Sequence, residues 1–429
     1  MDFLWVLLWM AIVAVLLCNL LAWTYPHYLL RYEFPFAICQ RIIARLTENT
    51  FFMALRLDYI AWKLGFSNRH TVTRFFMNGL PIFKQDPRLH IKKLQFDGVP
   101  VKQYQPREDH TKHQRGILFF HGGIGIWCST DTYERVCRYL ARESASFVVS
   151  VAYRLAPEHP YPAQFEDCLK ATIHLLKNAK EYGVDPDCIL VGGDSSGATL
   201  AAAVCQELVK RTDLPKVRAQ ILLHPFLQAV DFNLPSYQQN AFNLLISKHM
   251  LLEIGLKYRR KYSVQAAMKG SHVPDDIRIK WKTWINPDHI PKRFKSRGYK
   301  PAPPTPFPPK VLEQSNEFFE TTVSPLLAED DIISQLPETY ILTCEYDVLR
   351  DDGLLYKKRL EDAGVGVTWE HLEDAFHGVV IVLEIPVFPF SCATRKLDFV
   401  VKFIKGLHVS GESSLAGGVK AFTKGGGGI

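Results

Sequence analysis

A serine flanked by glycines is the part of this sequence most able to do chemistry. Ser195 lies in Gly193-Asp-Ser-Ser-Gly197, after the apolar run Cys188–Val191 and before the small residues Ala198–Val204. That order predicts a strand, a tight turn and a helix, and the two glycines allow the strained turn that an exposed nucleophile needs. A serine hydroxyl is a weak nucleophile at neutral pH, so it needs a base. The motif therefore predicts a hydrolytic nucleophile whose base comes from elsewhere in the chain.

Two downstream loops supply that base and the carboxylate that would orient it. Asp347 follows the apolar run 339–343, and His377 follows the run 367–371 and stands beside a glycine. Serine, carboxylate and histidine in this chain order are typical of a serine turn of this kind. We therefore predict that His377 takes the Ser195 proton and that Asp347 fixes the histidine tautomer.

The neighbouring acids and histidines are interpreted as structural. Glu345 is a weaker rival to Asp347 as the orienting carboxylate. Asp351 and Asp352 are interpreted as carboxylates at the start of a helix, where the helix dipole favours negative charge. A histidine is more often structural than catalytic, and three others keep that interpretation: His224, His272 and His371.

A glycine loop upstream could stabilise the charge that develops during attack. An attacked carbonyl becomes an oxyanion and needs N–H donors that are already in place. His121-Gly-Gly follows the apolar run 117–120, where such a loop is expected. The sequence predicts an oxyanion hole formed by the backbone amides of Gly122, Gly123 and Ser196, with His121 as part of the loop motif.

The elements that must hold these residues alternate between short apolar runs and helical stretches. Residues 94–105 alternate around Asp97-Gly98, which predicts a hairpin. Apolar strands separated by helices favour a parallel sheet covered on both sides. We therefore predict an α/β fold with a mostly parallel central sheet and helices on both faces. Strands are expected at 117–120, 147–153, 188–191, 219–223, 339–343 and 367–371, and helices at 133–143, 165–180, 197–210, 353–363 and 393–406.

The pattern is interrupted over residues 232–325, which are rich in proline and tryptophan. The run Pro301–Pro309 cannot continue a helix or a central strand. Long insertions in compact domains are usually functional, so we predict a lid over the site, with a simple surface excursion as the alternative. The tail 409–429 is rich in glycine and serine and is expected to be disordered.

The N-terminal segment is apolar enough to cross a membrane. In Phe3–Trp23 the only strongly polar residue is Asn19, and a helix of this length spans about 31 Å, roughly the hydrocarbon thickness of a bilayer. A cleavable signal peptide would instead have a basic start and a small-residue exit. We therefore predict a retained transmembrane anchor over residues 1–23. It is followed by a helical juxtamembrane and cap segment, 24–90, with helices at 36–46 and 50–64.

The side of the membrane on which the body lies is predicted less directly. Arginines follow the apolar segment and no basic residue precedes it, so the positive-inside rule favours a cytosolic body. The chain contains no Asn-x-Ser/Thr sequon, so nothing requires a lumenal one.

Composition narrows the remaining functions. The net charge of +7 is modest, and the basic clusters 257–261 and 292–297 are interpreted as solvated loops or a face near anionic lipid, not as a nucleic-acid surface. The nine cysteines show no C-x-x-C pair or zinc spacing. No metal site is therefore predicted, and the redox compartment stays open.

Together these residues resemble the hormone-sensitive-lipase group of α/β hydrolases, and most closely the arylacetamide deacetylase-like membrane esterases. The resemblance covers most of the chain and places the α/β-hydrolase domain at 91–408. Besides the anchor, it is carried by His121-Gly-Gly, Tyr153-Arg-Leu-Ala-Pro-Glu158, Gly193-Asp-Ser-Ser-Gly197, Leu234-Pro-Ser-Tyr-Gln-Gln239, Ser324-Pro-Leu-Leu327, Cys344-Glu-Tyr-Asp-Val-Leu-Arg-Asp-Asp-Gly353 and Phe376-His-Gly378.

The resemblance implies hydrolysis of carboxylic esters or amides with small lipophilic acyl groups, without a cofactor or metal. It also implies anchoring in the endoplasmic reticulum with a lumenal body. A disulfide of the family between the oxyanion-loop region and the Asp347 segment would here be Cys128–Cys344, with Cys128 shifted by two positions. That bridge would require a lumenal body, whereas the positive-inside rule favours a cytosolic one. The resemblance to the family favours the lumen.

Two residues depart from the family's pattern. Ile124 stands where the loop has a third glycine, which alters the oxyanion loop and the acyl pocket, and Ser196 stands where alanine is usual. We predict a membrane-anchored serine esterase or deacetylase that uses Ser195, Asp347 and His377. Two alternatives remain: a catalytically weak relative that binds lipophilic ligands, and a neutral-lipid hydrolase or acyltransferase with the same fold.

Overall fold

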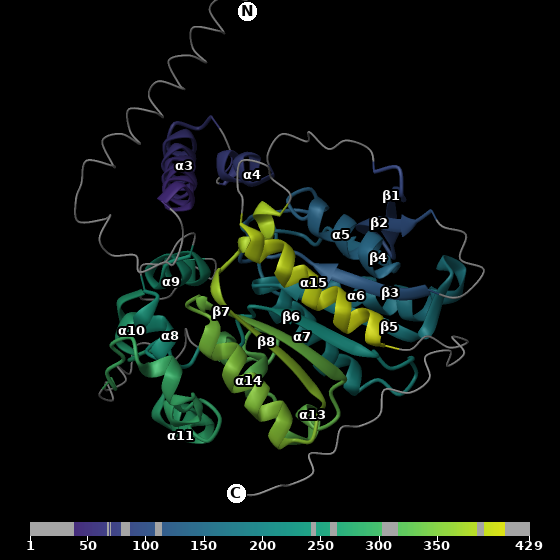
Figure 1. Cartoon of the computed structure of the whole chain (residues 1–429). Coiled ribbons are helices and arrows are strands. Elements are labelled where there is room, and N and C mark those ends of the chain that lie inside the picture. Colours follow the sequence, from purple (N-terminus) through teal and green to yellow (C-terminus); the bar gives the residue numbers. More distant parts are fainter. Residues whose placement is uncertain are drawn as a thin grey trace, which may run out of the picture.

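A single eight-stranded sheet forms the centre of the computed structural model (Figure 1). In chain order its strands are β1 (Leu89–Phe96), β2 (Val99–Pro106), β3 (Gln114–Phe120), β4 (Phe147–Val151), β5 (Val184–Asp194), β6 (Ala219–Leu223), β7 (Glu338–Tyr346) and β8 (Val367–Phe376). In space they are ordered β1-β2-β4-β3-β5-β6-β7-β8. β2 pairs antiparallel with β1 and β4, and all other neighbours are parallel, so the predicted hairpin and the mostly parallel sheet are confirmed.

The structure describes residues 38–66, 68, 70–78, 86–107, 114–241, 246–257, 264–302, 316–383 and 390–407, with side chains from residue 49 onward except at 382. The predicted helices beside the sheet are found within three residues of their expected ends, a typical uncertainty for helix termini. Outside the insertion the helices are α3 (Ile38–Lys63), α4 (Thr71–Asn78), α5 (Glu134–Ser144), α6 (Ala163–Asn178), η1 (Ala179–Tyr182), α7 (Ser196–Val209), α14 (Arg350–Asp362), η7 (Val379–Val382) and α15 (Ser391–Gly406).

Helices cover both faces of the sheet, because the central strands are apolar on both sides. β3, β4 and β6 are buried along their whole length. Leu118 and Phe120 of β3 pack in one core cluster with α6 and α7, whereas Ile117 and Phe119 pack in another with α5 and α15. Figure 1 shows α15 lying beside α5, in agreement with their contacts.

The N-terminal segment contains one long helix where two were predicted. α3 runs without a break through residues 47–49, so the expected separation of helices at 36–46 and 50–64 is wrong. Those three residues include no glycine or proline, and each costs little within a helix, so the backbone has no reason to break there.

The insertion packs against the body. Leu252, Val273 and Trp281 belong to the same buried cluster as side chains of α7 and α14. This burial argues against a simple surface excursion, although most of the proline run lies outside the described residues. The short elements between β6 and β7 are α8 (Pro235–Gln239), α9 (Lys248–Lys257), α10 (Val264–Lys269), α11 (Asp275–Trp281), η2 (Pro287–His289), η3 (Lys292–Lys295), η5 (Asn316–Phe319), η6 (Pro325–Leu327) and α13 (Asp330–Ile333).

Two predictions fall on parts of the chain outside the described residues. These are the anchor over 1–23 and the tail over 409–429. Among the helices of the described ranges, none combines the length and apolar character needed to cross a bilayer. α3 has 26 residues, but six of them are charged.

Candidate active site

Ser195 stands at a sharp turn between β5 and α7. Its backbone has φ 57° and ψ −120°, and its N–H donates to the carbonyl of Leu223 on β6 at 2.9 Å. The flanking glycines leave no room for side chains. A Cβ on Gly193 would lie 2.3 Å from the backbone of Gly197, and one on Gly197 would lie 2.1 Å from the carbonyl oxygen of Phe120. Close backbone packing therefore imposes the turn that the glycine spacing predicts.

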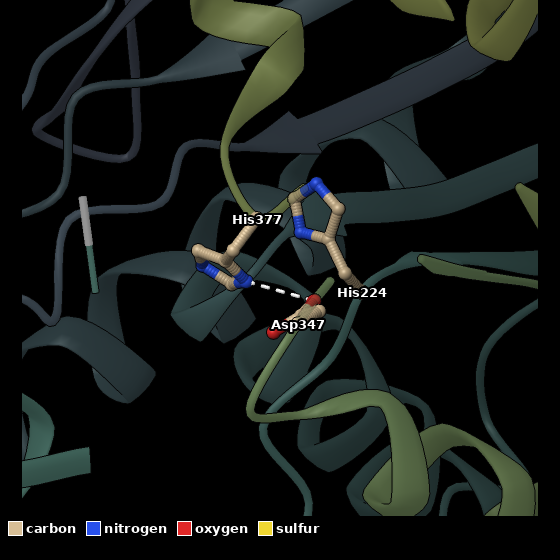
Figure 2. Close-up of side chains that lie close together, drawn as sticks. All are labelled: His224, Asp347 and His377. Atoms are coloured by element: carbon tan, nitrogen blue, oxygen red, sulfur yellow. Dashed lines mark hydrogen bonds and ion pairs between the residues drawn. The ribbon is translucent and has the colours of Figure 1, made fainter. Parts of the chain in front are cut away.

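The three residues predicted as a triad meet where β5, β7 and β8 end. Nε2 of His377 lies 2.9 Å from Oγ of Ser195. Its Nδ1 lies 3.0 Å from Oδ2 of Asp347 (Figure 2). The other oxygen of this wholly buried carboxylate accepts a hydrogen bond from the N–H of Leu349 at 2.8 Å. His377 and Ser195 are only 3% and 6% exposed, so this chain of hydrogen bonds is shielded from water.

The loop after β3 packs against Ser195. A Cβ on Gly122 would lie 3.3 Å from the Cβ of Ser195. Gly123 has φ +104°, and a Cβ there would lie 2.4 Å from the carbonyl oxygen of Trp127, so this position requires glycine. Within the described part of the chain, no acceptor engages the backbone N–H of Gly122 or Gly123. This arrangement is compatible with an oxyanion hole.

His121 supports the loop from behind. Its ring stacks on Tyr153 with centroids 4.2 Å apart, and its Nδ1 lies 2.8 Å from the carbonyl oxygen of Gly122. Burial lowers the pKa of His121 to about 4, so the ring is neutral near pH 7. A neutral ring held between these partners positions the loop.

The two departures from the family's pattern are joined by a hydrogen bond. The backbone N–H of Ile124 donates to Oγ of Ser196 at 2.9 Å. Ile124 has φ +59°, a left-handed conformation that costs a residue with a side chain about 1–2 kcal/mol. The hydroxyl of Ser196 therefore helps to stabilise a conformation that the isoleucine side chain disfavours.

A largely apolar cavity of about 150 Å³ opens beside Ser195. Ser195, Ser196 and Ile124 line it together with Leu251 and Leu252 of α9. Part of the insertion thus forms a wall of the site. The remaining lining residues are Gly125, Tyr161, Gln164, Thr199, Leu200, Phe226, Ala229, Phe232, Gly255, Phe318, Thr322, Val323 and Leu349.

Similarity to known proteins agrees with this geometry. A family model described as an alpha/beta hydrolase fold matches residues 117–268 and 299–381. The chain is 39% identical to human arylacetamide deacetylase-like 4 over 410 residues, which cover 94% of this chain and 99% of that protein. The chain belongs to the arylacetamide deacetylase-like group of α/β hydrolases.

Other relatives extend the comparison. Rat neutral cholesterol ester hydrolase 1 is 34% identical over 409 residues, covering 91% of this chain and 98% of that one. An esterase from Pyrobaculum calidifontis has the same fold, with a TM-score of 0.58 at 22% identity, over 86% of this chain and 98% of that one. The chain is therefore a serine hydrolase of carboxylic ester bonds, and its substrate is a separate question.

The other acids near the end of β7 have structural partners in this hydrolase. Glu345 forms an ion pair with Arg350 at 3.0 Å and lies 3.2 Å from His371. Burial works against its charge, but the bond to His371 and the nearby arginines lower the pKa of Glu345 to about 2. Asp351 and Asp352 lie in the first turn of α14, as predicted. None of these three replaces Asp347 as the partner of His377.

A histidine interpreted as structural from the sequence lies inside the site. The ring of His224 stands against that of His377, with centroids 4.5 Å apart (Figure 2). Its Nε2 lies 3.1 Å from Oδ1 of Asp194, whose other oxygen accepts from the hydroxyl of Tyr133 at 2.5 Å. Burial lowers the pKa of His224 well below its ordinary value, and the nearby charge of Lys396 adds to this, so the ring is neutral.

The site also brings three metal-ligand types together. Atoms of His224, Asp347 and His377 lie within 4.8 Å of one another. Both nitrogens of His377 already face Ser195 and Asp347, so a metal ion would have to displace those contacts. The donor set fits proton transfer better than metal binding.

The disulfide implied by the family resemblance is wrong here. Cys128 and Cys344 are both buried free thiols. Cys128 lies in a left-handed turn with φ +63° and its thiol bonds to Thr132, whereas Cys344 lies within β7 near Lys396 and Cys392. Burial raises the pKa of both thiols to about 12, so they are poorly reactive. The pair therefore lends no support to a lumenal body.

Proposed function

We propose that this chain is a membrane-anchored serine carboxylesterase or deacetylase that hydrolyses small lipophilic esters or amides through an acyl-enzyme. The hydrogen-bonded chain of Ser195, His377 and Asp347 beside an apolar cavity carries the proposal. Aligned partners of this kind argue against the catalytically weak alternative.

The chemistry follows from the geometry of these side chains. Nε2 of His377 takes the proton of Ser195 as Oγ adds to the substrate carbonyl carbon. The oxygen that becomes negative meets the amides of Gly122 and Gly123, with the Ser196 amide as a third donor. His377 then gives its proton to the leaving alcohol or amine. In the second half of the reaction His377 takes a proton from water as the water oxygen adds to the acyl carbon, and it returns that proton to Oγ of Ser195 as the acid leaves.

The cavity supports small lipophilic acyl groups as substrates. Its lining is largely apolar, and its volume of about 150 Å³ is below the roughly 300–1,000 Å³ of pockets for drug-sized ligands. The wall supplied by α9 supports the interpretation of the insertion as a lid, because displacing it would enlarge the cavity.

Hydrolysis of neutral-lipid esters is a second candidate. It is favoured by the 34% identity to rat neutral cholesterol ester hydrolase 1 over nearly the whole chain. A series of nitrophenyl esters of increasing acyl length separates the two. Activity that falls steeply beyond short acyl groups supports the first candidate, and activity that rises with chain length supports the second.

Replacement of the nucleophile tests the mechanism. Ser195→Ala is expected to lower kcat/KM on a short-chain aryl ester by about 10³-fold or more and to abolish labelling by a fluorophosphonate probe. Ser334→Ala, at an exposed serine after α13, is the control and should keep both properties. Undiminished turnover by Ser195→Ala would end the proposal.

The membrane part of the proposal places residues 1–23 across the endoplasmic-reticulum membrane and the body in the lumen. The apolar run supports the anchor, and family membership alone supports the lumenal side. Lys210→Asn creates the sequon Asn-Arg-Thr at an exposed turn after α7. A lumenal body predicts glycosylation of this variant in microsomes, and an unmodified product that proteases digest from outside would place the body in the cytosol. Release of the wild-type chain by alkaline carbonate would overturn the anchor.

A further inference from the structure

Exposed apolar side chains gather on α3, on the turn that follows it and on α4. In most soluble proteins large apolar side chains are scattered singly over the surface, and contiguous patches mark contact sites. Phe66 is 82% exposed and Phe75 is 68% exposed. Outside this region, Ile279 is the one comparably exposed large apolar residue in the described part of the chain. The α3–α4 surface comprises Phe52, Leu57, Tyr59, Ile60, Trp62, Leu64, Phe66 and Phe75.

Packing of the protein does not require these side chains. α3 already turns an inner face toward the body, where Phe51 meets Trp127 with ring centroids 5.3 Å apart and Ala54 is buried. Asp58 on the same face accepts hydrogen bonds from the N–H groups of Val72 and Thr73 and so caps α4. A surface helix with its inner face packed normally presents polar residues outward. Over residues 49–63, where its side chains are described, α3 has apolar residues on both its inner and its outer face, so the outer face needs a second apolar environment.

The charges on this surface indicate which environment. Among residues 49–66 the exposed charged side chains are Arg56 and Lys63, and the single acid in this stretch is buried. The ammonium of Lys63 lies 5.8 Å from the ring centroid of Tyr59. Aromatic rings mixed with basic side chains and free of acids are typical of segments that lie in the headgroup region of an anionic membrane.

The short distance along the sequence between the apolar run and α3 also indicates a membrane as the partner. Only residues 24–37 separate the apolar run from α3, and a fully extended chain of this length reaches about 50 Å at most. If the run crosses a bilayer, α3 stays within that distance of its surface. Figure 1 shows α3 and α4 at the periphery of the molecule, outside the helices that cover the sheet.

We propose that the α3–α4 surface lies in the headgroup region of an anionic bilayer and forms a second membrane contact besides the anchor. The loop after β3, which begins at His121 and includes Ile124 and Gly125 of the cavity lining, connects this contact to the cavity. Arg74 of α4 donates to the carbonyls of Ile126 and Ala156 and forms an ion pair with Glu158 at 2.8 Å. Binding to the bilayer thus fixes the loop and its cavity close to the phase in which lipophilic esters dissolve. The contact rests on the proposed anchor but not on the proposed hydrolysis.

Photo-crosslinking tests this contact in the full-length chain. Benzoylphenylalanine replaces Phe66, Phe75 or, as the matched control, the similarly exposed Ile279. Each variant is reconstituted in phosphatidylcholine–phosphatidylserine vesicles. Because the anchor tethers all three variants alike, only local contact can separate them. We expect at least about tenfold more phospholipid adduct at 66 and 75 than at 279. Equal lipid labelling at all three positions, no lipid adduct, or adducts only with another part of the chain or a second copy would overturn the proposal.

A second measurement detects a functional consequence without affecting the reacting groups. Leu64→Ser combined with Phe66→Ser is expected to reduce lipid adducts formed at position 75 several-fold. It should also reduce hydrolysis of an ester dissolved in the vesicles while leaving hydrolysis of a water-soluble ester unchanged. An equal loss on both esters would indicate damage to the fold and would count against the surface contact. Loss of activity in Ser195→Ala leaves the lipid adducts unaffected, so the two proposals fail separately.

Discussion

The serine turn and the oxyanion loop both depart from ordinary backbone geometry, but they are held in different ways. At the serine turn, backbone atoms lie within 2.3 Å of where a Cβ on Gly193 or Gly197 would be. At the oxyanion loop, Ile124 keeps φ +59° with its side chain present and with the hydroxyl of Ser196 as support. Packing leaves the first turn no alternative, whereas the left-handed conformation of Ile124 is supported by a hydrogen bond to a side chain. The loop is therefore the part of this site that a single substitution can tune.

The sharpest test of the packed turn is Gly197→Ala. The added methyl group meets the carbonyl oxygen of Phe120, so we expect a loss of about 4 kcal/mol or more in the free energy of unfolding. Chemical denaturation measures it. Gly406→Ala in α15 is the control, because nothing lies within 4 Å of its Cβ position, and its effect should stay within about 1 kcal/mol. Wild-type stability of Gly197→Ala would refute the packing argument.

Acid should lower the free energy of unfolding by protonating His121, which is buried behind the oxyanion loop. Its folded pKa of about 4 lies below the ~6.5 of an unfolded imidazole, so between these values the unfolded chain binds more protons. The stabilisation is complete above about pH 6.5 and is lost as the pH falls toward 4, by at most about 3 kcal/mol. Denaturation at pH 7 and pH 5 should show a smaller difference for His121→Asn than for the wild type. An identical pH dependence would contradict a buried neutral ring.

Tyr133 contacts both the serine turn and the oxyanion loop, so its replacement tests how much one hydrogen bond at their junction contributes to stability. Its hydroxyl donates to Asp194 beside Ser195 and would lie 2.7 Å from a Cβ on Gly122. Tyr133→Phe leaves a buried carboxylate without this donor, so the free energy of unfolding should fall by about 1–3 kcal/mol. Tyr340→Phe is the matched control, since within the described residues its buried hydroxyl has no partner and its removal should be neutral or stabilising. Equal losses in both variants would remove the special role of Tyr133.

A double-mutant cycle tests the support of the loop. Ser196→Ala removes the acceptor of the Ile124 N–H, which is worth about 1 kcal/mol, so kcat should fall about fivefold. In an Ile124→Gly background the same change should cost less, because glycine adopts a left-handed conformation without help. Steady-state kinetics on one aryl ester gives the coupling. Additive effects would show that the hydrogen bond does not position the loop.

The parts of the site that depend on local sequence and strand order could be predicted. Glycine spacing gives the serine turn, and parallel strands end at one edge of the sheet, so residues after β7 and β8 converge on Ser195. The position of His224 could not be predicted, because it depends on the register that pairs Asp194 with Leu223. The bond between Ile124 and Ser196 joins the loop after β3 to the first residue of α7, 72 residues further along the chain, so no local pattern reveals it.

Two family-based or composition-based expectations failed for identifiable reasons. Residues 47–49 have neither a strong preference for the helical conformation nor a strong preference against it. The sequence pattern therefore did not decide whether α3 is continuous there. The pairing of Cys128 with Cys344 was transferred across a shift of two positions. In a tight turn that shift redirects a side chain, and the two thiols have separate partners.

The hydrogen bonds of Arg74 to the carbonyls of Ile126 and Ala156 have a practical consequence for shortening the chain at its N-terminus. If the proposed anchor holds the chain in a membrane, removing everything before β1 would be the simplest way to obtain a soluble protein. It would also delete the guanidinium that holds the carbonyls of Ile126 and Ala156, and it would uncover Trp127. A shortened chain should therefore begin ahead of α3, with polar replacements at the outward residues of that helix.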